Sequence, residues 1–278
     1  KFRHDPYGEF RQAVDRGEDQ IDLGRAALTI ALPDYPDLDM VAYLGRIEQL
    51  AIEVTRRGDR SGDIHDSVAA LNHVLFRQHG FHGNSDQYYD PKNSFLNEVM
   101  ERKTGIPITL SVLYMEVAQR AGIAVDGVGF PGHFLVKHAQ GGVEIVIDPF
   151  HQGDINSRED LVGMLGGLYG GTAELLDEFL KPAGKKEILR RMLANLKGIY
   201  AKTNNLLRLL SVLDQTIILE PGAAAEVRDR AAVYLRLERF DRARADFECY
   251  LELAPHAQDA AAVREQLVDL AKRVTLIH

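Results

Sequence analysis

Residues 93–150 carry most of the information about the architecture of this chain, and they read NSFLNEVMERKTGIPITLSVLYMEVAQRAGIAVDGVGFPGHFLVKHAQGGVEIVIDPF. Their central part predicts a helix that begins at Pro107, because proline suits the first helical turn, where a backbone N–H has no partner within the helix. Gly122 ends this helix. Between these two positions, apolar side chains recur at helical spacing, at Leu110, Leu113, Val117 and Ala121.

A β-hairpin is predicted after the helix. The pair Gly141-Gly142 separates two strand-like runs, the first starting at His133 and the second ending at Asp148. If the two glycines form the turn, residue 140 faces residue 143. The alternation of side chains along strands then places His133 and Asp148 on one face of the sheet, as diagonal neighbours.

His133 and Asp148 are therefore a candidate catalytic pair. A carboxylate that accepts the Nδ1 proton of an imidazole fixes its tautomer and its orientation, as a general base or a metal ligand requires. The alternative is structural: His133 caps the bend after Pro131-Gly132, and Asp148 accepts backbone donors before Pro149. The spacing alone leaves both interpretations open.

The order of these motifs resembles the transglutaminase-like fold, which is papain-like. In that fold a cysteine nucleophile begins the helix, and a histidine and an aspartate lie on the strands that follow. The amino-acid sequences of the motifs are similar to those of the SirB1 family, which joins such a domain to tetratricopeptide-like helices. The motifs that carry this resemblance are YDP (89–91), NSFLNEV (93–99), GIPITLS (105–111), PGHF (131–134) and DPF (148–150).

The resemblance implies an α+β fold in two parts. Residues 1–181 are expected to form a helical lead-in and a small antiparallel sheet, with the transglutaminase-like core at 88–153. Residues 182–278 are expected to form an α-helical, tetratricopeptide-like domain. The run Pro182-Ala183-Gly184 between them suits a domain boundary.

The nucleophile of the wider fold is missing. A catalytic cysteine would stand at the start of the helix, where the helix N-terminus stabilises a thiolate. That position holds Pro107, which cannot attack a substrate, and the one cysteine of the chain is Cys249. Thr109 and Ser111 offer hydroxyls in its place, although a helix-cap or ordinary helical role is the simpler explanation for both.

A polar segment ahead of the helix supplies candidate ligand-binding residues. We expect it to lie against the Pro107 end of the helix and to line a cleft beside His133, with the residues Tyr88, Tyr89, Asn93, Asn97, Glu98, Thr109 and Ser111. The alternative is that Asn93 or Ser94 caps the helix that follows, and that Glu98 completes the capping arrangement.

No metal site and no cofactor are predicted. His73, His79 and His82 lie close together in the sequence, but they lack the i, i+4 spacing of a zinc-binding helix.

The last part of the chain repeats with the tetratricopeptide period. Pro221 and Pro255 close similar runs 34 residues apart, which is the length of this repeat. Small and aromatic residues stand where the paired helices of the second repeat interlock, at Ala231, Tyr234, Ala243 and Phe247. Such helices offer a groove for a protein or peptide partner, or they brace the first domain. Cys249 follows Phe247 closely and is expected to be a buried small side chain.

Composition limits the remaining classes of partner. A net charge of −8 argues against nucleic-acid binding. No apolar run is long enough to span a membrane, and a single cysteine fits a reducing compartment, so we expect a cytoplasmic protein. The composition does not predict an oligomeric state.

Two functions follow from these observations. The first is a non-catalytic transglutaminase-like protein that acts as a regulatory or protein- or ligand-binding module, in line with the SirB1 resemblance. The second is a hydrolase or acyltransferase that acts on an amide bond through His133 and Asp148, with water, Thr109 or Ser111 in place of the cysteine. The absence of a cysteine at position 107 favours the first.

Overall fold

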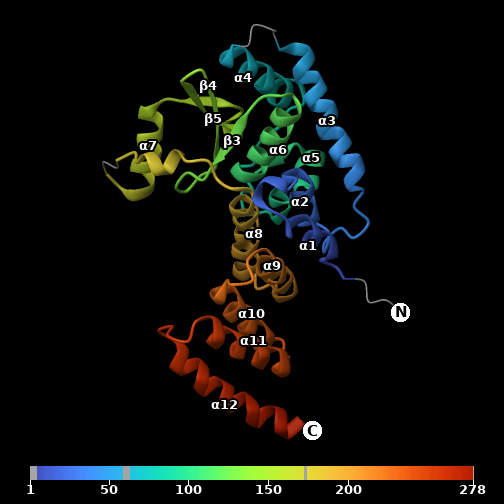
Figure 1. The fold of residues 1–278 in the computed structure, drawn as a ribbon, viewed down its shortest axis with the longest axis vertical. Coiled ribbons are helices and arrows are strands. Elements are labelled where there is room, and N and C mark those ends of the chain that lie inside the picture. The colour runs from blue at the N-terminus through green and yellow to red at the C-terminus, as the bar shows by residue number, and fades with distance from the viewer. Residues whose placement is uncertain (1–4, 59–62, 172–173, 278) are drawn as a thin grey trace. The chain divides into compact units, whose positions relative to one another are not determined.

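The computed structural model describes residues 5–58, 63–171 and 174–277. The chain separates into two compact units, Lys1–Met192 and Leu193–His278. Figure 1 follows the element order by colour from the N-terminus to the C-terminus. The first unit combines helices with a small sheet and the second is helical, so the expected α+β class is confirmed.

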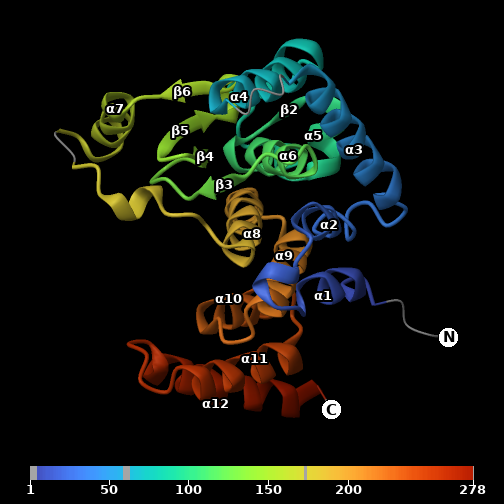
Figure 2. The same cartoon turned by 45° about the horizontal axis from the view of Figure 1, so that its top comes forward.

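Helix α6 (Pro107–Arg120) is the centre of the first unit. It is buried from Pro107 to Ala118, as expected of a helix that carries apolar residues on every face. In Figures 1 and 2 it lies between the sheet on one side and α3 on the other. The elements that precede it are α1 (Gly8–Val14), η1 (Glu18–Gln20), α2 (Leu23–Thr29), α3 (Met40–Arg57), α4 (Ile64–Asn72), the π-helical turn η2 (His73–Gln78), the 3-10 turn η3 (Pro91–Ser94) and α5 (Leu96–Arg102).

The main sheet has four antiparallel strands in the order β3, β4, β5, β6. Their bounds are β3 (Val125–Val128), β4 (Leu135–Gln140), β5 (Val143–Asp148) and β6 (Asp154–Asn156). The short strands β1 (His82–Gly83) and β2 (Thr104–Gly105) form a separate parallel pair.

The predicted hairpin register is confirmed. Gln140 pairs with Val143 across the turn. Gly141 and Gly142 have φ values of 60° and 83°, and a two-residue turn with positive φ at both positions favours glycine. The first strand begins at Leu135, later than predicted, so His133 lies in the turn ahead of β4.

Helix α7 (Arg158–Tyr169) covers the other face of the sheet. Ser157 caps it by accepting a hydrogen bond from the Asp160 backbone. Its buried Leu161 and Leu165 pack in one apolar cluster with Val128 and Leu135 of the sheet. The chain then passes through η5 (Asp177–Leu180) to α8 (Lys185–Lys202). The sheet is therefore enclosed by α6 and α7.

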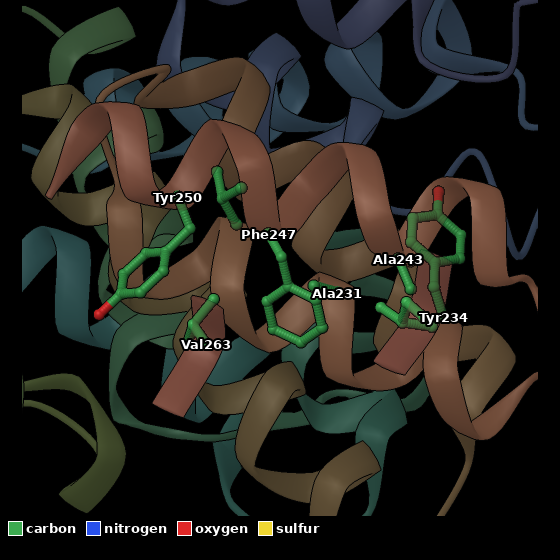
Figure 3. Packing of buried hydrophobic residues seen from close by; sticks show 8 residues of the cluster. Ala231, Tyr234, Ala243, Phe247, Tyr250 and Val263 are labelled. Atoms are coloured by element: carbon green, nitrogen blue, oxygen red, sulfur yellow. The ribbon is translucent and has the colours of Figure 1, made fainter. Parts of the chain in front are cut away.

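The second unit contains the helical repeats. After α8 its helices are α9 (Leu206–Leu219), α10 (Ala224–Arg236), α11 (Phe240–Leu253) and α12 (Ala260–Ile277). The small residues predicted to interlock, Ala231 and Ala243, are 0% exposed. Figure 3 shows them packed beside the rings of Tyr234 and Phe247. No described helix has both the length and the apolar character needed to cross a lipid bilayer.

The predicted burial of Cys249 is wrong, because its side chain is exposed. Ala243, Phe247 and Tyr250 are buried, and their spacing of three and four residues places them on one face of α11. Cys249 stands two residues after Phe247, which rotates it to the opposite face.

Candidate functional site

His133 is positioned by the turn between β3 and β4. Its backbone N–H donates to Phe130 at 3.0 Å, and its carbonyl accepts from Arg191 Nη2 at 2.9 Å. The preceding Gly132 has a φ of 69°, which glycine adopts without strain. The imidazole is thereby directed at Asp148, and the two side chains meet with Nε2 at 2.8 Å from Oδ2.

Asp148 uses its two oxygens differently. Oδ1 accepts the backbone N–H groups of Phe150 at 2.9 Å and His151 at 3.4 Å, which caps the turn η4 (Pro149–His151). Oδ2 faces His133. The two interpretations that the sequence leaves open, a capping aspartate and a partner of the histidine, therefore describe the two oxygens of one carboxylate.

A second histidine completes the cluster. His151 Nδ1 lies 2.7 Å from Asp148 Oδ2, and the rings of His133 and His151 are stacked with centroids 6.0 Å apart. His151 lies in the turn beyond β5, so the alternation of side chains along the strands does not predict its place. A local sequence pattern could have indicated it. Asp148 precedes a proline and caps the turn that begins there, and such a turn brings the residue three positions later, His151, back to the carboxylate.

The two imidazoles determine the electrostatics of Asp148. Its side chain is 3% exposed, whereas His133 is 13% and His151 59% exposed. Burial by itself raises the pKa of Asp148. The hydrogen bonds and charges of His133 and His151 outweigh burial and hold the pKa below its usual value. Asp148 is therefore an ionised acceptor at neutral pH.

The ring nitrogen that contacts the carboxylate differs from the prediction. From the sequence we expect Nδ1 of His133 to pair with Asp148, whereas in the structure Nε2 does so. His133 lies ahead of β4, so its ring spans a longer distance to Asp148 and meets it with the outer nitrogen. In the neutral imidazole the proton must then stand on Nε2, since the carboxylate only accepts.

Aromatic side chains line the cluster. The Phe150 ring meets His133 edge to face at 6.0 Å and Tyr88 at 6.1 Å. Tyr88 in turn contacts Tyr89, which is 66% exposed. Burial, with a smaller contribution from Tyr89, raises the pKa of Tyr88. Of the predicted cleft residues, Tyr88 thus reaches the site, through Phe150.

Four other predicted cleft residues are buried, namely Asn93, Asn97, Thr109 and Ser111. The Thr109 hydroxyl accepts from the Ile106 backbone at 3.2 Å and donates to the Asn93 carbonyl at 2.7 Å. The Ser111 hydroxyl donates to the Phe134 carbonyl at 3.4 Å. Both hydroxyls therefore connect α6 to neighbouring backbone.

The segment before α5 adopts a different arrangement from the capping alternative. Phe95 occupies the N-cap position, and no side chain caps the helix. The Asn93 amide instead donates to the Gln87 carbonyl at 2.7 Å, which holds the preceding loop. Glu98 lies 4.0 Å from Lys92. The expectation that Asn93 or Ser94 caps α5 is therefore wrong.

A sequence model of the transglutaminase-like superfamily matches residues 41–194, which contain the whole cluster. This match covers more than half of the chain. The chain belongs to the transglutaminase-like superfamily. A tetratricopeptide-repeat model matches residues 196–268, so the transglutaminase-like part is followed by repeats, as expected.

Proteins from bacteria and from a mammal are similar in sequence to this chain. A UPF0162 protein of Xylella fastidiosa is 38% identical over 265 residues, which is 94% of each chain. One of Pseudomonas aeruginosa is 29% identical, over 90% of this chain and 91% of its own. F-box only protein 21 of Mus musculus is 35% identical over 143 residues, 47% of this chain and 21% of that protein. No solved structure matches the chain.

In this transglutaminase-like unit the start of α6 is closed. Pro107 is the first residue of the helix and is buried, with Ile106 and Ile108 beside it at 2% and 3% exposure. Within the described residues, the imidazole of His133 hydrogen-bonds to Asp148 and not to any hydroxyl or thiol. The histidine–aspartate pair predicted from the sequence is thus formed, and among the described residues neither a hydroxyl nor a thiol contacts the imidazole.

The cluster also has the donor atoms of a metal site. One ligand atom from each of His133, Asp148 and His151 lies within 4.8 Å of the other two. Two of the three histidines considered from sequence are engaged elsewhere: His79 Nε2 contacts Glu53 at 2.7 Å, and His82 Nδ1 contacts the Gly80 carbonyl at 2.9 Å.

Proposed function

We propose that this chain is a non-catalytic transglutaminase-like protein that binds a protein or peptide partner through its tetratricopeptide-like helices and acts as a regulatory module. The observation that carries the proposal is the closed start of α6. A thiol enzyme needs a nucleophile within hydrogen-bond reach of its histidine, and the corresponding position is the buried Pro107. The similarity of the motifs to the SirB1 family supports the same role.

The hydroxyls at the start of α6 support this conclusion. Thr109 is 0% exposed and already engages two backbone groups, at Ile106 and Asn93. Ser111 is also 0% exposed and donates to the Phe134 carbonyl. A serine or threonine nucleophile requires a base that takes its proton, and neither hydroxyl has His133 as its partner.

The repeats supply the binding part of the proposal. Their cores are formed by matched small and aromatic residues, which leaves the outer faces available for a ligand. Large apolar side chains remain exposed on these helices: Leu207 of α9 is 63% exposed, Leu253 of α11 41% and Val268 of α12 57%. Exposed apolar groups of this kind contribute to protein contacts when they come together in a patch.

The absence of catalysis is tested first. The purified full chain is incubated with a glutamine-containing protein and a fluorescent amine, and with peptide amide substrates, beside its His133→Ala variant. We expect both proteins to behave alike at the background rate. A turnover that His133→Ala lowers by about a hundredfold or more, the usual contribution of a general base, would overturn the proposal.

The binding role is tested by comparing variants as bait. Wild type, His133→Ala and the double variant Leu207→Asp/Leu253→Asp are immobilised and exposed to lysate of the source organism. We expect wild type and His133→Ala to retain the same proteins, and the double variant to lose them. Retention that depends on His133 and not on the repeat surface would assign the binding to the cluster instead.

A further inference from the structure

We propose that His133, Asp148 and His151 bind one divalent transition-metal ion of the Zn²⁺ class. This inference goes beyond the partner-binding role, because its ligand is inorganic and its residues all lie in the first unit. It rests on three features: the convergence of the donor atoms, the support behind the carboxylate, and the access from solvent.

The three donor atoms lie close together, within 4.8 Å of one another. His133 Nε2 and His151 Nδ1 lie 2.8 Å and 2.7 Å from the same oxygen, Asp148 Oδ2. Around a tetrahedral ion with bonds of about 2.0–2.2 Å, neighbouring donors stand roughly 3.4 Å apart. The two contacts therefore need to open by roughly 0.6–0.7 Å to admit the ion.

The carboxylate is held in place by backbone. Oδ1 of Asp148 accepts from the N–H groups of Phe150 and His151, so the Oδ2 atom keeps its orientation when the imidazoles move. Hydrogen bonds of this kind behind a ligand fix its geometry and raise metal affinity. The Arg191 guanidinium donates to the His133 carbonyl at 2.9 Å, and this contact holds the backbone without involving the imidazole.

The site is open on one side. Asp148 is 3% exposed and His133 13%, but His151 is 59% exposed. An ion can therefore enter past His151 and displace little structure. The Phe150 ring packs at a steep angle against both imidazoles, with centroids 6.0 Å from His133 and 5.1 Å from His151.

Binding requires a shift of tautomers that the site permits. Nε2 of His133 and Nδ1 of His151 must present lone pairs to the ion, so each neutral ring carries its proton on the other nitrogen. Two imidazoles and one carboxylate suit Zn²⁺, Co²⁺, Ni²⁺ or Fe²⁺ better than Ca²⁺ or Mg²⁺, which prefer oxygen ligands. Three protein ligands leave a coordination position for water or another small ligand.

The experiment measures metal affinity of the full chain. Zn²⁺ is titrated by calorimetry, and Co²⁺ by its visible absorption, in a Cys249→Ser background, because the exposed thiol also binds these ions. We expect one ion per chain and an affinity that His151→Ala lowers at least about tenfold. His65→Ala removes another exposed imidazole, on α4, and serves as the matched control that keeps the affinity.

The outcomes separate the proposal from its alternatives. Equal affinities for His151→Ala and His65→Ala, or binding of Zn²⁺ no tighter than that of a His133→Ala/His151→Ala double variant, would show a hydrogen-bonded cluster without a metal. Zn²⁺ should also raise the melting temperature of the Cys249→Ser protein and leave that of His151→Ala unchanged. Neither result alters the partner-capture experiment, so the two proposals fail independently.

Discussion

Asp148 combines two tasks at the scale of a single residue. It caps η4 with one oxygen and pairs with two imidazoles through the other. Because the folded-state pKa is lowered, the carboxylate contributes stability above the unfolded-state pKa of about 3.9. That contribution is lost as the pH falls through the folded-state pKa.

Asp148→Asn is therefore predicted to lower the free energy of unfolding by about 3 kcal/mol near neutral pH, because it breaks a buried charge-assisted cluster. The difference from wild type should shrink as the pH falls below about 3.9. Urea unfolding followed by circular dichroism from neutral to acidic pH checks both statements. Asp154→Asn, on the paired strand β6 and exposed, is the control. A pH-independent difference contradicts the role of the charge.

The hydroxyls of α6 allow a second prediction at this scale. Thr109→Val keeps the shape of the side chain but leaves the Ile106 N–H and the Asn93 carbonyl without this partner. We expect a loss of about 2–3 kcal/mol. Ser111→Ala removes one long bond to Phe134 and should cost about 1 kcal/mol. Equal losses in denaturant unfolding would argue against the bridging role of Thr109.

Sequence patterns predict residues within regular elements well and residues in turns poorly. The Gly141-Gly142 turn determines the register of β4 and β5, and hence the approach of His133 to Asp148. His151 and the choice of Nε2 depend on the path of the chain outside the strands. Asn93 is a residue type that favours helix N-caps. Its side-chain amide instead donates to the Gln87 carbonyl and fixes the preceding loop, because tertiary contacts override local propensity.

At the scale of elements, the site is held by the packing of η4 against β1. A methyl group added at Gly83 would stand 2.6 Å from the Phe150 ring and 2.6 Å from its carbonyl oxygen. No side chain fits there unless backbone moves. Gly83 therefore allows η4, and with it Asp148 and His151, to approach the parallel strand pair.

Gly83→Ala is predicted to destabilise the protein by about 1–3 kcal/mol through overpacking, and to alter the histidine ring signals in NMR spectra. Gly45→Ala is the matched control, since Gly45 is an exposed position of helix α3 with no atom within 4 Å of the added carbon. It should stabilise by about 0.5–1 kcal/mol. The two substitutions should therefore change the free energy of unfolding in opposite directions. A change in the same direction would contradict the contact between Gly83 and Phe150 as the cause.

At the scale of the whole molecule, two independent divisions nearly coincide. The transglutaminase-like match ends at residue 194 and the repeat match begins at 196, while the compact units meet between Met192 and Leu193. The sequence predicts a boundary earlier, at the Pro182 break, because a proline- and glycine-rich run there is typical of a linker. That boundary stays a prediction. The split between the compact units falls inside the regular helix α8, where the sequence carries no such signal.

The second unit is tied together by a charge network as well as by its apolar core. Arg230 of α10 donates to Asp246 of α11 at 2.7 Å through two nitrogens, and to Asp214 of α9 at 2.8 Å. Burial disfavours the charged guanidinium, but the hydrogen bonds and charges of Asp246 and Asp214 raise its pKa. One side chain therefore joins three consecutive helices.

Arg230→Met is predicted to cost about 3 kcal/mol, because it leaves two carboxylates with little exposure and without their shared cation. Arg244→Ala is the control: its partner Glu248 lies on the same helix and both side chains are about half exposed, so solvent already screens the pair and stability should hardly change. The chain contains no tryptophan, so far-UV circular dichroism during urea unfolding provides the measurement. If both variants unfold at the wild-type midpoint, the apolar contacts of Ala231, Tyr234 and Phe247 suffice to hold the repeats together.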